Sequence, residues 1–351
     1  MSSPTQFKGT LVVTGGSGYI GAQIVRAALT QGYAVRLTAR TAASASQAAA
    51  RHPQFADTPQ LTTSVVGDIT DASAYAPVFA GGAVTGVVHA ASPFNVQPSD
   101  NVRDLLTPAV RGSTAVLEAA RRWGGPRVRR VVVTSSFGAV VDPGRGARPG
   151  YVYAEADWNP TSWDEAAVAD GVVAYCTSKS LAERAAWDWV AAQKKQQDPV
   201  SFDLATICPP WVFGPYAGGL RGAKSLSESI DLLRGIVDAA EVPPFDFGGF
   251  ADVRVVAEAH IRALEVPEAG GQRFLIGQDY RHQLAVDIAR EAFPELRDRL
   301  PEGRPGHVEP AYSIDGSKAS RVLGIKYRTL DETIKDTFEQ LLRDKQIEEK
   351  A

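Results

Sequence analysis

The stretch Thr14-Gly-Gly-Ser-Gly-Tyr-Ile-Gly21 joins a short apolar run, Thr10–Val13, to an amphipathic segment, Tyr19–Gln31. A strand that enters a helix through a glycine-rich turn is typical of a phosphate-binding unit. The glycines let the backbone turn sharply and approach a phosphate closely, while the start of the helix offers free N–H groups to the anion. Such a turn also occurs as a plain tight connection, so the rest of the chain has to support the functional interpretation.

Outward from this turn, β-branched runs alternate with helical segments as far as Cys208. The expected strands are Thr10–Val13, Ala34–Ala39, Leu61–Val66, Gly86–His89, Val128–Thr134 and Phe202–Ile207. The expected helices are Tyr19–Gln31, Ala42–Arg51, Val102–Arg122 and Val172–Lys194. This alternation predicts an α/β fold of the Rossmann type, a doubly wound parallel sheet with helices on both faces.

The sequence changes character after Cys208, where a proline- and aromatic-rich stretch leads into a glycine-rich loop. We therefore predict a dinucleotide-binding Rossmann domain over residues 1–208. A smaller, mixed and mainly substrate-binding lobe is expected over residues 209–351, discontinuous in that some segments return to the first domain. The length of 351 residues agrees with two lobes at about 150 residues per domain. Further elements expected are a helix at Ala251–Leu264, a strand at Phe274–Gly277 and a helix at Leu330–Arg343.

Composition and charge limit the possible partners. The chain has 44% hydrophobic and 22% charged residues, as in an ordinary globular protein, and a formal net charge of −3. This charge favours neither nucleic acid nor an acidic membrane surface, and no stretch reaches the roughly 18 apolar residues of a membrane span. The five histidines and two cysteines are scattered without metal-ligand spacing, so we predict no metal. Few cysteines and no signal-peptide pattern favour the cytoplasm.

The end of the second strand predicts which dinucleotide binds. A carboxylate about 20 residues after the glycines would hold the free ribose hydroxyls of NAD. This chain instead has Leu37-Thr-Ala-Arg40. The guanidinium of Arg40 could form charge-assisted bonds to a 2′-phosphate, which favours NADP, while Arg36 within the strand is a weaker rival.

Two further strand ends suggest cofactor contacts. After the third strand, Asp68 could accept a hydrogen bond from an adenine amino group with Ile69 against the ring, although a Gly-Asp turn explains the same residues. After the fourth strand, His89-Ala-Ala-Ser-Pro-Phe94 offers small residues at the carboxyl edge of the sheet, where a cofactor can approach closely. Phe94 would then face a substrate.

Tyr175 and Lys179 are four residues apart, so both project from the same side of the expected helix. A phenol with its usual pKa of about 10 is a weak acid-base group at neutral pH, and a nearby ammonium would lower that pKa. The hydroxyls of Thr134-Ser-Ser136, at the end of the fifth strand, could bind a carbonyl oxygen on which negative charge develops. This combination points to hydride transfer with a tyrosine as proton donor.

These features resemble the extended short-chain dehydrogenase/reductase family, and within it the group of dihydroflavonol reductases, cinnamoyl-CoA reductases and yeast methylglyoxal or aldehyde reductases. The similarity covers nearly the whole chain and rests on Thr14–Gly21, Val35–Arg40, His89–Phe94, Pro108–Thr114, Val131–Ser136, Tyr175–Lys179, Cys208–Pro215, Asp252–Arg254 and Leu323–Tyr327. The chain departs from cinnamoyl-CoA reductases at Val173-Ala-Tyr-Cys-Thr177, where they have Asn-Trp-Tyr-Cys-Tyr, which argues against a CoA thioester substrate.

The resemblance implies a set of site residues. The catalytic residues would be Ser136, with Ser135 as runner-up, Tyr175 and Lys179. The cofactor, NADPH, would contact Gly15, Ser17, Gly18, Tyr19, Ile20, Gly21, Arg40, Asp68, Ile69, Ala90, Ala91, Ser92, Thr134, Tyr175, Lys179, Pro209 and Val212. The substrate would meet Phe94, Phe137, Trp211, Phe213 and Tyr216, although each aromatic ring could equally belong to the core.

The sequence therefore predicts an NADPH-dependent reductase of a small-molecule aldehyde or ketone, bulky or aromatic, acting as a monomer or homodimer. Two alternatives remain open at this point. One is a nucleotide-sugar epimerase or dehydratase of the same fold, which would carry NAD or NADP. The other is a non-catalytic dinucleotide-binding protein, which would typically lack the tyrosine or the lysine.

Overall fold

The main sheet of the computed structural model, which describes residues 7–220 and 226–347, consists of seven parallel strands in the order β10-β7-β5-β4-β1-β2-β3. These strands are β1 (Thr10–Thr14), β2 (Ala34–Ala39), β3 (Leu61–Val65), β4 (Val84–His89), β5 (Arg130–Thr134), β7 (Asp203–Cys208) and β10 (Gln272–Leu275). The strand order reverses between β1 and β4, where an open α/β sheet leaves a crevice for ligands at its carboxyl edge. The predicted Rossmann-type sheet is confirmed.

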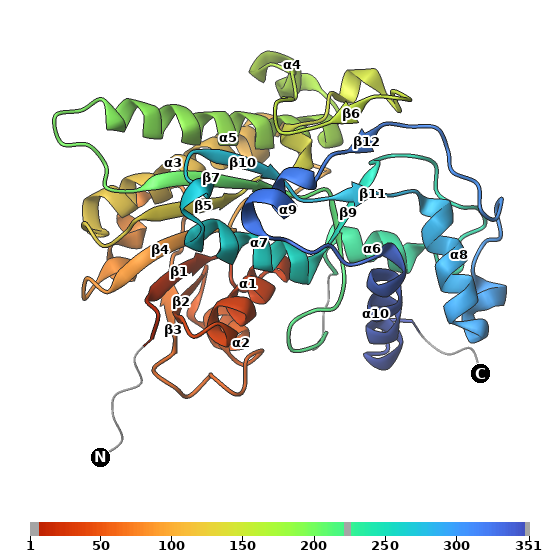
Figure 1. The fold of residues 1–351 in the computed structure, drawn as a ribbon, viewed down its shortest axis with the longest axis horizontal. Coiled ribbons are helices and arrows are strands. Elements are labelled where there is room, and N and C mark those ends of the chain that lie inside the picture. The colour runs from red at the N-terminus through yellow and green to blue at the C-terminus, as the bar shows by residue number, and fades with distance from the viewer. Residues whose placement is uncertain (1–6, 221–225, 348–351) are drawn as a thin grey trace.

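Helices cover both faces of this sheet (Figure 1). One face carries α1 (Tyr19–Thr30), α2 (Ala42–Ala49) and α7 (Val253–Glu265), and the other carries α3 (Thr107–Trp123) and α5 (Gly171–Lys194). The valines of β5 show why its sequence is apolar throughout. Val131 and Val133 pack in the core beneath α3 and α5, while Val132 packs against α7 on the opposite face.

The C-terminal part forms a smaller mixed sheet with its own helices (Figure 1). In this sheet β9 (Gly249–Asp252) lies between β8 (Trp211–Phe213), to which it is parallel, and β11 (Gln278–Asp279), to which it is antiparallel. The helices α6 (Glu228–Gly235), α8 (His282–Ala292) and α10 (Leu330–Arg343) pack around a second hydrophobic core. Two elements of this region belong to the first part of the molecule instead: α7 packs on the main sheet, and β10 is its edge strand, paired with β7.

The remaining elements are short. They comprise β6 (Val152–Tyr153), which pairs with β12 (Ser313–Ile314), the helices α4 (Trp163–Val168) and α9 (Ser317–Leu323), the π-helical turn η2 (Val102–Leu106), and the 3-10 turns η1 (Ala72–Phe79), η3 (Phe137–Ala139), η4 (Pro143–Arg145), η5 (Pro267–Ala269) and η6 (Pro294–Arg299). No helix within residues 7–220 and 226–347 is long and apolar enough to cross a membrane.

Two predicted helices differ from the structure near their starts. The helix expected from Ala251 begins at Val253, because Ala251 belongs to β9 and the Asp252 carboxylate caps α7 by accepting from the Arg254 N–H at 2.8 Å. The segment expected as one helix from Val102 begins with a π-helical turn, and α3 follows at Thr107. Pro108 has no N–H for the carbonyl four residues earlier, so regular α-helical bonding is interrupted there.

Candidate active site

A cavity of about 610 Å³ lies at the carboxyl edge of the main sheet, on the side of the smaller sheet. One end is formed by the glycine turn and the other by β8, the start of α6 and Asp246–Phe247. Many of the predicted site residues line it, namely Gly15, Gly18, Tyr19, Ile20, Gly21, Ala90, Ser92, Phe94, Thr134, Ser136, Tyr175, Lys179, Pro209, Trp211 and Val212. The predicted phosphate-binding turn and the predicted Ser–Tyr–Lys set therefore face one continuous space.

The glycine turn leaves room for a ligand because its backbone is packed too tightly for side chains. Gly15 has a φ of +66°, and a Cβ there would lie 2.7 Å from the backbone nitrogen of Ala91. A Cβ on Gly21 would collide with the carbonyl oxygen of Gly15. The turn ends at Gly18, the N-cap of α1, whose first N–H groups have no acceptor within the helix. These features fit the pyrophosphate of a dinucleotide.

The side chains of Ser136, Tyr175 and Lys179 line the cavity and lie close to one another. The Lys179 ammonium donates to the Ser92 hydroxyl at 2.6 Å and lies 5.2 Å from the centre of the Tyr175 ring. The Ser136 hydroxyl oxygen accepts from the Gly138 N–H at 3.0 Å, which leaves its own O–H to interact with the Tyr175 phenol. Phe94 packs edge-on against Tyr175, with ring centres 4.8 Å apart.

Burial controls the pKa values of both titratable groups of this set. It raises the pKa of the Tyr175 phenol well above 10, a hydrogen bond with Ser136 acts in the opposite direction, and the Glu228 carboxylate raises the pKa further. Burial also lowers the pKa of Lys179 to about 8. The predicted lowering of the phenol pKa by Lys179 is not seen, because burial has the largest effect and the lysine is not among the groups that shift this pKa. The phenol stays protonated at neutral pH.

A buried carboxylate beneath the cavity holds several of these elements together. Glu183, on the same helix as Tyr175 and Lys179, accepts hydrogen bonds from the hydroxyls of Ser135 at 2.7 Å and Thr206 at 2.6 Å. It also pairs with the Arg273 guanidinium on β10 at 2.7 Å. Burial opposes the charge on Glu183, but Arg273 and the hydroxyls hold the pKa of its carboxyl below the usual range. Because Ser135 is engaged here, the geometry favours Ser136 over Ser135 as the catalytic serine.

Two buried histidines fix hydroxyls at the sheet edge. The His260 Nδ1 lies 2.7 Å from the Val256 carbonyl, so it carries the proton, and Nε2 accepts from the Thr134 hydroxyl at 2.7 Å. His89 lies 2.8 Å from the Thr14 hydroxyl, which also accepts from the Ala91 N–H. Burial lowers the pKa of His260 to about 4 and that of His89 to about 3, so both rings are neutral.

The predicted nucleotide-selecting residues lie at the ends of β2 and β3, beyond the glycine turn. Arg40 is exposed at the end of β2, whereas the rival Arg36 donates to the carbonyls of Val78 and, at 3.0 Å, Ala80. This engagement favours Arg40 as the residue available to a phosphate. The exposed Asp68 carboxylate accepts from the N–H and hydroxyl of Thr70, both at 2.8 Å, so the alternative of a local turn is realised there. Ile69 is partly buried against the core beside η1.

The remaining predicted cofactor residues lie beside the cavity lining. Ser17 is within the glycine turn, where its carbonyl accepts from the Arg51 guanidinium at 2.7 Å. Ala91 follows β4, with its N–H bonded to Thr14.

The five aromatic residues predicted to meet the substrate lie in different places. Phe94, with half of its surface exposed, and Trp211 line the cavity. Phe137 and Phe213 are completely buried in aromatic clusters, around Tyr312 and Tyr280 respectively, and do not line it. Tyr216 packs against Tyr19 with ring centres 4.5 Å apart and also lies outside the lining. These three rings do not line the cavity, because they pack against other aromatic side chains in the core.

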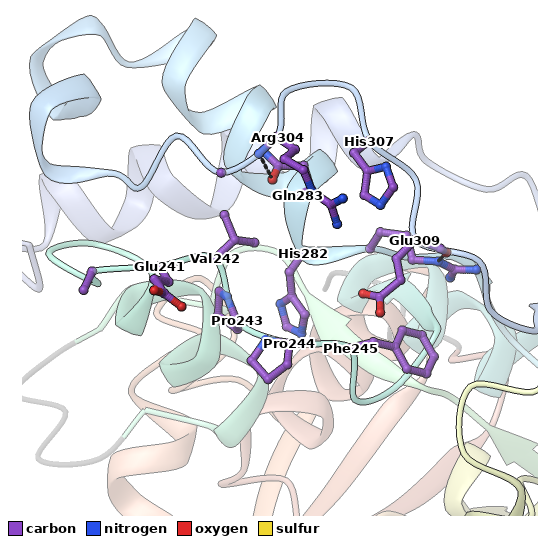
Figure 2. A pocket seen from close by; sticks show the side chains of 13 residues that line it. Glu241, Val242, Pro243, Pro244, Phe245, His282, Gln283, Arg304, His307 and Glu309 are labelled. Carbon is purple, nitrogen blue, oxygen red and sulfur yellow. Dashed lines mark hydrogen bonds between the residues drawn. The ribbon is translucent and has the colours of Figure 1, made fainter.

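Several lining residues were not singled out from the sequence. Ser227, Glu228, Asp246 and Phe247 line the substrate end of the cavity. Asp246 also accepts from the Trp211 indole N–H at 3.3 Å and lies 3.1 Å from His282 Nε2. Figure 2 shows His282 beside Pro243 and Pro244 in a neighbouring cavity of about 410 Å³, so Asp246 lies between two hollows. No local sequence pattern marks these residues, whereas Glu183 continues the spacing of four from Tyr175 and Lys179.

The chain was compared with known protein families. The NAD dependent epimerase/dehydratase family matches residues 11–277 of the chain. The chain belongs to this family. The matched region spans the glycine turn, the Ser–Tyr–Lys set and β10, so the family assignment and the cavity concern the same part of the molecule.

Relatives within the family match nearly the whole chain. The NADPH-dependent methylglyoxal reductase of Saccharomyces cerevisiae is 35% identical over 344 residues, covering 95% of this chain and 98% of the relative. A ketoreductase of Aspergillus niger is 34% identical over 346 residues, covering 95% and 97%. The crystal structure of yeast methylglyoxal/isovaleraldehyde reductase complexed with NADPH has a TM-score of 0.89 at 34% identity, covering 96% of this chain and 99% of that one.

Proposed function

We propose that this protein is an NADPH-dependent reductase that converts an aldehyde or ketone to an alcohol, with Tyr175 as the proton donor. The observation that carries this proposal is the single cavity that joins the glycine turn to Ser136, Tyr175 and Lys179. Full-length similarity to an NADPH-dependent methylglyoxal reductase and to a ketoreductase supports it.

The cofactor, when bound, supplies the hydride that reaches the carbonyl carbon. We propose that the Gly15–Gly21 turn and the start of α1 hold its pyrophosphate, and that Arg40 holds the 2′-phosphate. Lys179 would bind the nicotinamide ribose through its ammonium group. The family name includes NAD-dependent epimerases, but the guanidinium at the end of β2 favours NADPH over NAD.

Each member of the Ser–Tyr–Lys set has a distinct part in the chemistry. Ser136 donates a hydrogen bond to the carbonyl oxygen of the substrate, where negative charge develops. Tyr175 is protonated at neutral pH and transfers its phenolic proton to that oxygen. The resulting phenolate accepts a hydrogen bond from the Ser136 hydroxyl, while Lys179 holds the nicotinamide ribose.

We further propose that the substrate-binding lobe begins at Pro209 and receives a bulky or aromatic carbonyl compound. Phe94 packs against Tyr175, and Trp211 provides further aromatic surface in the same cavity. The two cysteines are free thiols, which agrees with a reducing compartment such as the cytoplasm.

The test is direct. Purified protein is mixed with NADPH and a panel of aldehydes, β-ketoesters and aryl ketones, and NADPH absorbance is followed. We expect a decline with at least one carbonyl class and a much slower decline with NADH. No decline with any compound, or NAD held tightly by the purified protein, would overturn the proposal in favour of an epimerase or a binding protein.

A further inference from the structure

The charged groups around the cavity are unevenly distributed. At the substrate end, the carboxylates of Glu228 and Asp246 both line the wall. Lys179 is the one cationic side chain that lines the cavity within residues 7–220 and 226–347, and its ammonium is bonded to Ser92. A substrate that approaches Tyr175 therefore meets two negative charges at the substrate end.

Glu228 acts on the reacting end of the cavity. It is the first residue of α6, exposed, and its negative charge raises the pKa of the Tyr175 phenol. This electrostatic coupling means that a negative charge on a substrate near Tyr175 would also be repelled by Glu228. The same carboxylate would leave a neutral carbonyl compound unaffected.

Asp246 is held in place by its neighbours. Its carboxylate accepts hydrogen bonds from the Trp211 indole at 3.3 Å and from the Phe247 N–H, and it lies 3.1 Å from the His282 ring. Trp211 and Phe247 pack edge-on with ring centres 5.8 Å apart, so the carboxylate is anchored beside an aromatic wall.

A neutral polar group completes this end. Ser227 also lines the cavity beside Glu228. Its side chain is uncharged, so it adds no positive charge that would offset the two carboxylates.

We infer that Glu228 and Asp246 select substrates by their charge. The enzyme reduces uncharged carbonyl compounds and rejects carboxylate-bearing ones such as α-keto acids. This inference rests on the proposed reductase function. It names two specificity-determining residues and the class of compound that they exclude.

The experiment uses a matched pair of substrates, ethyl benzoylformate and its hydrolysed anion, benzoylformate. With NADPH at neutral pH, kcat/KM for the ester should exceed that for the anion by about tenfold or more, since two nearby charges act in partly solvated surroundings. Raising the ionic strength from about 0.05 to about 0.5 M should reduce this ratio, because salt screens exposed charges.

The variants Glu228→Gln and Asp246→Asn remove each charge while keeping size and hydrogen-bonding oxygen. Each should reduce the ester-to-anion ratio about threefold, and the double variant more, because the repulsion is electrostatic. The matched control is Glu268→Gln, which changes an exposed carboxylate in η5 outside the cavity lining. This variant should leave the ester-to-anion ratio unchanged. Should Asp246→Asn fail to fold, Glu228→Gln on the exposed start of α6 carries the test alone.

The outcomes separate the inference from the function on which it rests. If neither the ester nor any aldehyde consumes NADPH, the proposed function itself fails. If the ester is reduced but the anion is reduced equally well, or if both charge-removing variants leave the ratio unchanged, the function stands and the inference is overturned.

Discussion

The glycine-turn end and the substrate end of the cavity are built in different ways. At the first, the lining comes from one continuous stretch, Gly15–Gly21, whose backbone passes from β1 into α1. At the second, it comes from segments that are distant in sequence: Trp211–Val212 on β8, the region from Leu226 to Leu232, and Asp246–Phe247. The first end can bind a ligand with backbone groups, whereas the second relies on side chains brought together by folding.

The Ser–Tyr–Lys set, which we call the centre of the cavity, shares features of both ends. Tyr175 and Lys179 are positioned by one helix, but that helix is fixed to the sheet by the buried Glu183 and its partner Arg273. A change at the substrate end should therefore alter which carbonyl compound is accepted, while a change at the Ser–Tyr–Lys set or at Glu183 should remove the activity or destabilise the fold.

The largest effect is expected at the centre, from Tyr175→Phe. Without the phenolic proton donor, kcat should fall by about 10³-fold, within the range of general acid catalysis, while NADPH binding persists. NADPH absorbance measures the first quantity and NADPH fluorescence titration the second. Tyr33→Phe, which removes a hydroxyl bonded to Glu265 outside the cavity, is the control. Unchanged turnover in Tyr175→Phe would assign the proton transfer elsewhere.

The next effect concerns stability. Glu183→Ala should lower the free energy of unfolding by about 3 kcal/mol, because it leaves the Arg273 guanidinium buried without its partner. The matched control is Glu118→Ala, which breaks the exposed Glu118–Arg122 pair on α3 and should cost less than about 1 kcal/mol. Chemical denaturation measures both. An equal loss of unfolding free energy in both variants would contradict the inference that the Glu183–Arg273 pair holds α5 against the sheet.

A smaller effect is expected at the nucleotide end. Arg40→Ala should reduce the preference for NADPH over NADH by about 30-fold, since a charge-assisted contact to a phosphate contributes about 2 kcal/mol. The ratio of kcat/KM values for the two cofactors measures this preference. Arg121→Ala, at another exposed arginine, should leave it unaltered. A ratio that stays constant in Arg40→Ala would place the 2′-phosphate contact on another residue.

The smallest effect is a pH dependence. Lys179 has a pKa of about 8, so its ammonium is present below that pH and is lost as pH rises through it. Because the proposed role of Lys179 uses its ammonium group, kcat/KM should fall about tenfold per pH unit above this point. Lys179→Arg keeps a positive charge at higher pH and should move or remove the decline. The same decline in both proteins would exclude Lys179 as its cause.

The elements that could be predicted from the amino-acid sequence are those whose signal is local. The glycine turn, the alternating strands up to Cys208, the helix Leu330–Arg343 and the spacing of Tyr175 and Lys179 could all be predicted, because strand burial, helix periodicity and turn geometry depend on neighbouring residues. The boundaries of α7 and α3 were missed because β9 and Pro108 override the local pattern.

Which side chains share the cavity became clear from the folded chain alone. Phe137 and Phe213 look like pocket residues in sequence but pack in the core, while Ser227, Glu228 and Asp246 lack any motif and line the substrate end. The physical reason is that these contacts join segments far apart along the chain. Their positions follow from how the smaller sheet and its helices pack against the main sheet, and residue type alone does not encode that arrangement.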